Sequence, residues 1–382
     1  MDTNYKKRNI IFVGLYRIFS RMYFYLPIMF PLFYFAGESV LNVELLLAAY
    51  GLSTIAFLPI AKIIIKHIGH KYIIEFGEVF KILGLIILIF YANNLSISFV
   101  AQALMGLGYA FIVGNDTMIL QQTFGYENSG EYQSVQSKTN SYMFLALLFS
   151  GLIGAIIFKY SIKMVLVLSI FSAILSIISI ACINYKKVKI PKEELLPLHP
   201  VNKMAANYYF LTRGVILSMF VGIFPYFFLI KLHISIILFG VIISIFTLSG
   251  FYSSRYLAKY LKKYSFDFLT ACSLFLALIG VSFLLSNSVY LGFSTAFIFG
   301  VLSGCVRPIT VSKIDNKKYS VEKTLKKAEL NYGIFSAALL AVAGILIEYI
   351  SFSAFIISVI TVLLYIVSLK VFYQLKERTH EN

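Results

Sequence analysis

Apolar segments of about 20 residues recur along the whole chain, and short polar connections separate them. A helix of that length crosses the roughly 30 Å hydrocarbon core of a bilayer. No connection is long enough for a soluble domain, so the pattern predicts an all-α membrane protein with twelve transmembrane helices. The predicted spans are residues 9–35, 44–65, 72–92, 95–120, 139–159, 163–184, 207–230, 234–256, 267–286, 288–311, 328–349 and 351–373.

The least apolar connection divides six predicted spans from six and points to an internal repeat. One offset pairs Lys62, after the second span, with Arg255, after the eighth, and it also pairs Lys66 with Lys259. Parallel six-span repeats form two bundles around an axis along the membrane normal. We predict two pseudo-symmetric six-helix halves and a cytoplasmic linker. Their ranges are 1–184, 185–206 for the linker, and 207–382.

Basic residues gather on one side of the predicted topology, in the two termini and in the connections after even-numbered spans. The other side carries only Lys159, Lys163 and Lys231. Because basic connections stay in the cytoplasm, both termini are predicted to be cytoplasmic, in the cytoplasmic (inner) membrane of a cell. This distribution accounts for the net charge of +16, so no nucleic-acid partner is predicted.

Composition agrees with a membrane protein and argues against catalysis. The chain is 59% hydrophobic and has a mean hydropathy of +0.84, whereas soluble proteins are about 45–50% apolar. Cys182, Cys272 and Cys305 lie in apolar segments without C-x-x-C spacing, and the five histidines are scattered. We predict no metal site, no cofactor and no enzymatic activity.

Charged residues inside the predicted spans are candidates for function, because a charge in hydrocarbon is costly. Arg17 and Arg21 lie four residues apart in the first span, a spacing that predicts a shared helix face. Their planar guanidinium groups suit a substrate oxyanion. Alternatively, both form a structural pair that snorkels or bonds to acids. Asp116 in the fourth span lies at similar depth, either in a static gate or as a titrating partner.

Further charges lie near the cytoplasmic ends of other spans. Glu75 and Glu78 begin the third span, and Glu78 is expected to pair with Lys81. Arg213 lies early in the seventh span, and Arg307 closes the tenth, where we interpret it as a loop anchor. The outer half of the bundle is predicted to be almost uncharged and rich in aromatic residues.

Two stretches resemble known motifs. After the second span, KIIIKHIGHK (62–71) aligns with G-x-L-x-D-R-x-G-R-[KR]; Gly69 and Lys71 fit, whereas Lys66 replaces the acid and His70 an arginine. In the fourth span, GLGYAFIVGNDTMIL (106–120) resembles the small-residue run of exporters. With the twelve-span layout, these stretches make the chain resemble the major facilitator superfamily.

The resemblance implies that the first and fourth spans line a central cavity, and it groups the candidate residues into three sets. The substrate-binding set is Arg17, Arg21, Tyr25, Gln102, Asn115, Arg213 and Tyr226. The proton-coupling or gating set is Asp116, Glu75 and Glu78. The set for conformational change is Lys62, Lys66, Gly69, Lys71, Arg255 and Lys259.

The predicted function is secondary transport by alternating access, with export of a small organic, amphipathic or anionic molecule in antiport with protons. The expected partners are that small-molecule substrate and the lipid bilayer, and the chain is expected to be a monomer. One alternative is uptake or exchange of a sugar or organic acid. A second is a non-transporting membrane receptor or immunity protein, suggested by the altered motif at 62–71.

Overall fold

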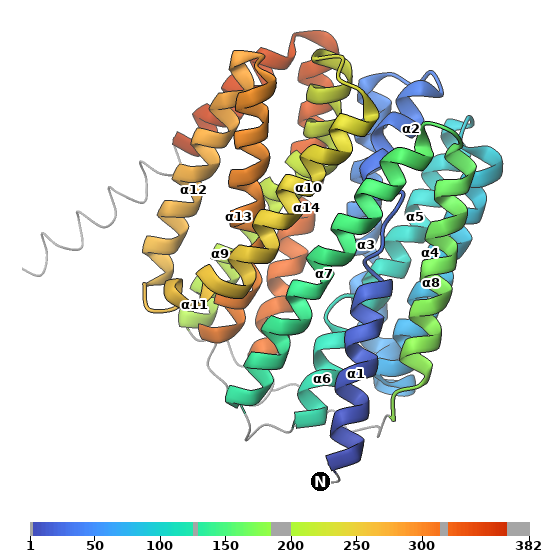
Figure 1. Cartoon of the computed structure of the whole chain (residues 1–382), viewed down its shortest axis with the longest axis vertical. Coiled ribbons are helices and arrows are strands. Elements are labelled where there is room, and N and C mark those ends of the chain that lie inside the picture. The colour runs from blue at the N-terminus through green and yellow to red at the C-terminus, as the bar shows by residue number, and fades with distance from the viewer. Residues whose placement is uncertain (1–2, 125–128, 185–199, 314–319, 365–382) are drawn as a thin grey trace, which may run out of the picture.

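The structure is a computed structural model that describes residues 3–124, 129–184, 200–313 and 320–364. Within these ranges the chain forms helices joined by short turns, and no β-strand is present. The helices lie side by side in one bundle (Figure 1). The all-α prediction is therefore confirmed.

The helices fall into an earlier and a later set along the chain. The earlier set is α1 (Thr3–Phe19), the short η1 (Leu26–Ile28), α2 (Met29–Phe35), α3 (Val40–Ile68), α4 (His70–Tyr91), α5 (Leu95–Ile112), α6 (Asn115–Phe124), α7 (Ser129–Phe158) and α8 (Ile162–Ala181). The later set is α9 (Pro200–Ser218), the π-helices η2 (Met219–Ile223) and η3 (Tyr226–Lys231), α10 (Ile236–Tyr252), the π-helix η4 (Ser253–Leu257), α11 (Ala258–Leu261), α12 (Phe266–Phe283), η5 (Leu284–Ser286), α13 (Val289–Lys313), α14 (Ser320–Tyr349) and a helix at Phe352–Leu364.

Among the described residues, nine helices are long and apolar enough to cross a membrane. The other three predicted spans correspond to the interrupted α1–α2 segment, to α4 with its four charged residues, and to Phe352–Leu364. The count of twelve therefore remains a prediction. On α4, the large apolar side chains that face outward are Phe76, Val79, Leu83, Ile86 and Phe90. This stripe suits contact with lipid, since it recurs every three or four residues.

The two ends of the bundle differ in charge. The N-terminal end of α1, the α3–α4 turn and α11 lie together at the bottom of Figure 1, and we call this the basic end. The opposite end, which we call the apolar end, holds the turns after α2, α4, α7 and η3.

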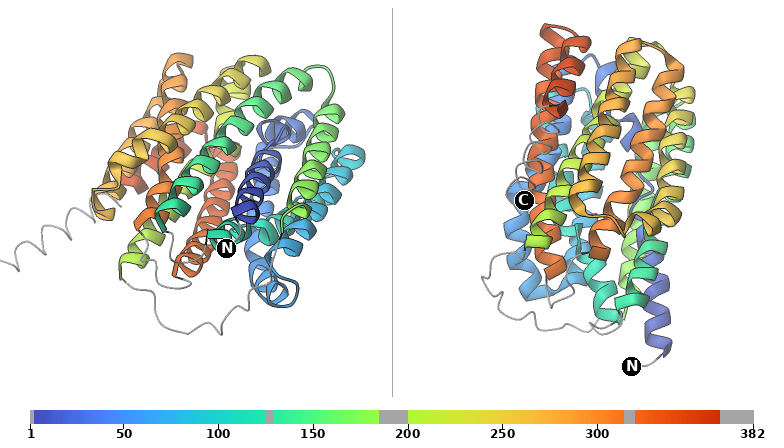
Figure 2. Two further views of the ribbon diagram at one scale, coloured as in Figure 1. Left: turned by 60° about the horizontal axis from the view of Figure 1, so that its bottom comes forward. Right: turned by 90° about the vertical axis from the view of Figure 1, so that its left-hand side faces the viewer.

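The earlier and later sets meet along two long contacts. α3 packs along α14, and α7 packs along α10 (Figure 2). Glycines allow the backbones to approach closely: Gly51 on α3 faces Gly333 and Ala337 on α14, and Gly151 on α7 faces Ile243 on α10. Small residues at helix contacts are typical of membrane bundles, where packing drives association.

Pro27 interrupts the first helix. α1 ends at Phe19, and residues 20–25 are not helical. A proline cannot donate its backbone hydrogen bond and clashes with the carbonyl four residues earlier. At the end of α1, the Phe19 carbonyl accepts from Ser172 Oγ at 2.5 Å and from the Met22 backbone N–H at 3.2 Å. The prediction that Arg17 and Arg21 share a face of one helix is therefore wrong.

Gly114 interrupts the fourth span in the same way. It has a φ of +79°, which glycine adopts without strain, and it separates α5 from α6. Asn115 Nδ2 donates to the Phe111 carbonyl at 2.6 Å and satisfies an acceptor that the break exposes. The break places Asp116 in the first turn of α6, where a negative charge is favoured.

Other boundaries also differ from the sequence prediction. α9 begins at Pro200, inside the predicted linker 185–206, whose earlier part lies outside the described residues. The predicted basic loop near 66–71 is reduced to Gly69, which has a φ of +86° and joins α3 directly to α4. Lys62 and Lys66 therefore lie on helix α3 rather than in a loop.

The close approach of α4 and α5 gives a stability test. A Cβ added to Gly77 would lie 2.6 Å from the Gly108 carbonyl oxygen and 2.7 Å from Ile112 Cγ1. We expect Gly77→Ala to lower the free energy of unfolding by about 1–3 kcal/mol, because the helices must move apart. The measurement is thermal unfolding of the purified protein in detergent. Gly14→Ala is the matched control, since its Cβ would meet only Thr139 at 3.9 Å; equal effects of both variants would contradict the argument.

Candidate functional site

A cavity of about 980 Å³, counted up to its open side, lies between the earlier and later sets of helices. The interrupted first span, α3, α5, α9 and α14 all contribute to its wall. Polar lining residues are Arg21, Tyr23, Tyr25, Tyr50, Thr54, Gln102, Tyr109, Arg213, Glu329, Tyr332 and Ser336.

Arg21 is the cation of this cavity that has no carboxylate partner among the described residues. It donates from Nη1 to the Tyr23 hydroxyl at 2.7 Å, and its guanidinium lies 5.7 Å from the centroid of the Tyr109 ring. The break at residues 20–25 directs this side chain into the cavity instead of along α1. An arginine held by neutral and aromatic groups keeps its charge available to an anion.

Arg213 is a second cavity cation, but a carboxylate accompanies it. Glu329 on α14 lies 3.5 Å from Arg213 and accepts a hydrogen bond from the Tyr209 hydroxyl at 2.5 Å. Arg213 also donates from Nη2 to the Tyr109 hydroxyl at 3.2 Å and lies over the Tyr332 ring. Tyr109 thus stands between the two cavity arginines and links α9 to α5.

Gln102 supplies a side-chain amide nitrogen that has no hydrogen-bond partner among the described residues. Its side chain is buried on α5 and lines the cavity, and its Nε2 atom has no protein acceptor among the described residues. A buried polar group without a partner is costly, so a ligand that places a hydrogen-bond acceptor beside Gln102 Nε2 would bind more tightly. Tyr25 and Tyr50 add aromatic surface beside it.

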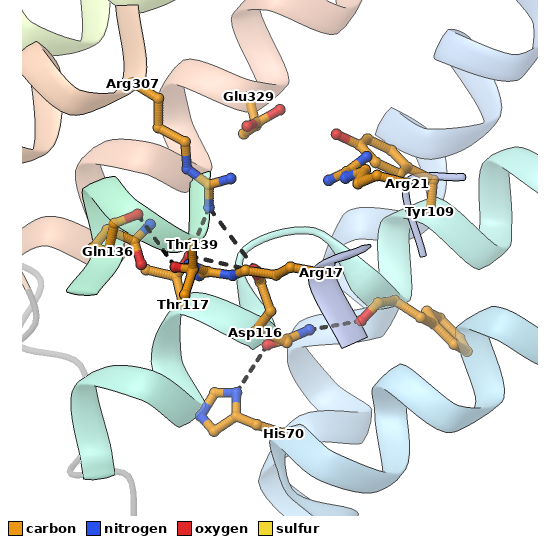
Figure 3. Close-up of polar contacts among 12 residues, drawn as sticks. Arg17, Arg21, His70, Tyr109, Asp116, Thr117, Gln136, Thr139, Arg307 and Glu329 are labelled. Atoms are coloured by element: carbon orange, nitrogen blue, oxygen red, sulfur yellow. Dashed lines mark hydrogen bonds and ion pairs between the residues drawn. The ribbon is translucent and has the colours of Figure 1, made fainter. Parts of the chain in front are cut away.

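Arg17 points away from the cavity into a buried network nearer the basic end (Figure 3). Its Nε donates to Asp116 Oδ2 at 2.7 Å, its Nη1 to Thr139 Oγ1 at 2.5 Å and its Nη2 to Thr117 Oγ1 at 3.2 Å. A guanidinium with three oxygen partners is well compensated for leaving water. The predicted Arg17–Asp116 partnership is present.

Arg307 joins this network from the other set of helices, as Figure 3 shows. It donates from Nη2 to Thr117 Oγ1 at 2.6 Å and lies 4.0 Å from Asp116 Oδ1. α13 continues through Pro308 to Lys313, so the loop-anchor interpretation of Arg307 is wrong. We call Arg17, Asp116, Thr117 and Arg307 the gate cluster. It bridges α1, α6 and α13 across the bundle.

Asn115 and Tyr226, two predicted substrate-binding residues, lie outside the cavity lining. Asn115 is buried and contacts His70 Nδ1 at 2.8 Å on the α4 side of the gate cluster. Tyr226 lies near the apolar end, stacked on Phe352 at 5.5 Å. The cavity lining thus includes Arg21, Tyr25, Gln102 and Arg213 of the predicted substrate-binding set, and not Arg17.

The acids of α4 are placed differently from Asp116. Glu78 is fully buried, pairs with Lys81 as expected, and accepts a hydrogen bond from the Tyr16 hydroxyl at 3.3 Å. Glu75 is partly exposed on the same helix, one turn from Lys71. Neither acid lines the cavity.

The residues predicted to assist conformational change lie at the basic end. Lys71 Nζ donates to the carbonyls of Ala181 at 2.6 Å and Ile183 at 3.1 Å, at the C-terminus of α8 where a cation is favoured. Lys62, Lys66 and Lys259 are exposed. Arg255 is exposed as well and stacks on Phe251 and Tyr256, and Gly69 forms the turn described above.

The sequence analysis missed two acids inside predicted spans. Glu329 opens the eleventh span and faces the cavity, and Glu44 opens the second span and is completely buried. The rule that charged residues within spans are functional candidates singled out Asp116, and it applies to Glu329 and Glu44 as well. Among the described residues, no cluster of three or more His, Cys, Asp or Glu could hold a metal ion.

Comparisons with known proteins agree with this architecture. The sequence matches the family described as Major Facilitator Superfamily over residues 10–318. No curated protein sequence matches the chain. Among solved structures, the crystal structure of the human organic anion transporter MFSD10 (TETRAN) is similar in fold. The two structures match with a TM-score of 0.71 at 10% sequence identity, and the match covers 97% of this chain and 100% of the MFSD10 chain. By fold and by sequence, the chain belongs to the major facilitator superfamily.

Proposed function

We propose that this chain is a secondary transporter that exports a small amphipathic organic anion by alternating access. The observation that carries the proposal is Arg21, a cavity cation without a carboxylate partner among the described residues. A transporter site lies near the middle of the membrane at the junction of the two halves, beside interrupted helices. The cavity lies beside the interruption at residues 20–25 and between the earlier and later sets of helices, which supports this proposal.

The charges of the cavity support a monoanionic substrate. Arg21 and Arg213 carry two positive charges and Glu329 carries one negative charge, which leaves one positive charge for the ligand to balance. The surrounding tyrosines and aliphatic side chains offer apolar surface to an organic body. Gln102 Nε2 offers one further donor to an oxygen of the substrate.

The proposed orientation assigns one end of the bundle to each side of the membrane. The basic end is placed in the cytoplasm because lysine and arginine concentrate there, in the cytoplasmic membrane of a cell. The gate cluster then closes the cytoplasmic side, and the substrate leaves through the apolar end. Export itself rests on the exporter-like stretch at 106–120.

Proton coupling is assigned to Glu329 in this proposal, and Asp116 is assigned to the gate. Glu329 lines the cavity, and its Oε2 has no hydrogen-bond partner among the described residues. Asp116 is held by arginines from both sets of helices, which suits a contact that opens and closes.

The test of the proposal is transport by the purified protein in liposomes. Aromatic carboxylates of graded length, with their neutral amides, are first screened for thermal stabilisation of the protein. A stabilising carboxylate should then show counterflow into liposomes preloaded with the same compound. Stabilisation without counterflow would favour a receptor, and counterflow of sugars alone would favour a metabolite carrier.

The first prediction concerns Arg21. Arg21→Gln should weaken carboxylate binding by about 1.5–3 kcal/mol, the value of a hydrogen bond to a charged group, or roughly 10- to 150-fold in Kd. The weak affinity for the neutral amide should stay unchanged. Binding is measured by titration calorimetry in detergent. Arg255→Gln, on the exposed surface, is the matched control; an equal loss of affinity in both variants would remove Arg21 from the site.

The second prediction concerns the gate cluster. Arg307→Gln removes a charge-assisted hydrogen bond to Thr117. Such a bond contributes at least about 1.5 kcal/mol, so the equilibrium constant for opening the basic end should rise roughly tenfold. Ser137→Cys reports opening, because Ser137 Oγ donates to the Ser254 carbonyl at 3.5 Å across the same contact. We expect about tenfold faster alkylation by a maleimide in a variant without the native cysteines. An unchanged rate would show that Arg307 does not hold this end closed.

The third prediction separates substrate exchange from the coupling of transport to protons. Glu329→Gln keeps an acceptor for Tyr209 but cannot titrate, so counterflow should persist while uptake driven by a pH gradient is lost. Both activities are measured in the same liposomes. Glu75→Gln, on α4 outside the cavity lining, should retain both. Gradient-driven uptake that survives Glu329→Gln would assign coupling to another group.

A further inference from the structure

Glu44 lies in an unusual environment for an acidic residue. It is on the second turn of α3, near the apolar end, and none of its surface is exposed. Neither carboxyl oxygen has a hydrogen-bond partner among the described residues. The cavity described above does not include it.

The groups around this carboxyl belong to the later set of helices. A Cβ on Gly222 of η2 would collide with both Glu44 oxygens, and Leu340 of α14 packs at the same point. Gly344 of α14 faces the Glu44 Cβ and Leu41. The carboxyl is thus enclosed where α3 meets η2 and α14, and this enclosure exists only while the two sets of helices are packed together at the apolar end.

Among the described side chains of α3, η2 and α14, none forms an ion pair with Glu44. η2 consists of Met219–Ile223 and carries no ionisable residue, and α2 carries only Tyr34. The other acids of this end have partners: Glu38 accepts from Asn42 Nδ2 at 2.9 Å, and Glu348 accepts from the Val40 backbone N–H at 3.1 Å.

A carboxyl enclosed without a partner is far less costly when neutral than when ionised. We propose that Glu44 is a proton-binding site that controls the apolar end: the protonated acid permits α3 to pack on η2 and α14, and the ionised acid requires water and favours separation. The proton comes from water on the apolar side and returns to that side on opening. Glu44 therefore controls closure of the apolar end and transfers no net proton across the membrane.

The sign of the effect follows from linkage. The closed end binds one proton more than the open end, so acidic conditions favour closure and rising pH favours opening. For one linked proton, the ratio of open to closed molecules rises at most about tenfold per pH unit. The inference rests on the proposed alternating access, but it requires no substrate.

The experiment measures the distance across the apolar end in lipid nanodiscs. Spin labels at Tyr160→Cys and Tyr290→Cys report on the two sets of helices, in a variant with Cys182, Cys272 and Cys305 replaced by serine. Between about pH 5 and pH 9, where buried glutamates titrate, the long-distance population should rise with pH. Glu44→Gln mimics the neutral acid and should keep the short distance throughout.

Two variants provide controls. Glu44→Asp keeps a carboxyl and should retain the pH response. Glu38→Gln removes an acid from the same end and should also retain it. The proposal would be overturned if the distance did not change with pH while Glu44 is present, or if it changed equally in Glu44→Gln. A response lost in both Glu44→Gln and Glu38→Gln would assign it to the general charge of this end instead, and so would overturn it too.

The result is separable from the proposed transport function. A Glu44-dependent distance change without transport of any carboxylate would leave this inference standing and refute the proposed function. Transport of a carboxylate without a pH-dependent distance change would support the proposed function and refute this inference.

Discussion

The interrupted helices at residues 20–25 and at Gly114 determine the rest of the site. Inside a bilayer, irregular backbone is tolerated only where protein or a cavity satisfies it. Ser172 satisfies the first break and Asn115 the second. Without the first break, Arg21 would follow Arg17 along one helix; with it, the two arginines occupy separate environments. One lines a cavity, and the other joins Asp116 in a network that reaches α13.

Charge balance explains the different roles of the two arginines. Arg17 has three oxygen partners and almost no exposure, so its charge is already used within the protein. Arg21 has a phenol and two aromatic rings, which stabilise a cation without neutralising it. A partly buried cation of this second kind is expected where a ligand supplies the anion. The sequence shows two arginines four residues apart, and only the helix break distinguishes them.

The apolar pattern was sufficient to predict the all-α class and the nine long spans, because hydrocarbon thickness imposes helix length. The Arg17–Asp116 and Glu78–Lys81 pairs followed from depth and spacing. The break before Pro27 could not be predicted from the proline alone, because α3 and α13 continue as helices through Pro59 and Pro308. The reach of Arg307 into the gate cluster could not be predicted either, because it depends on how α13 sits against α6. Glu44 and Glu329 were visible as acids within spans, but their opposite environments required the packing of α14.

The two ends of the bundle are held by different kinds of contact, and this difference has a consequence for a transport cycle. At the basic end, the Asp116 carboxylate attracts two arginines as ions, and water entering on opening would screen these pairs. At the apolar end, a carboxyl without a partner is enclosed by glycine and leucine, so closure there depends on removing a charge. In the proposed cycle, acid strengthens closure at the apolar end while the ion pairs of the gate cluster persist, since arginine stays protonated and its partner carboxylate is stabilised. In that cycle, closure of the apolar end responds to the pH of its own side of the membrane only.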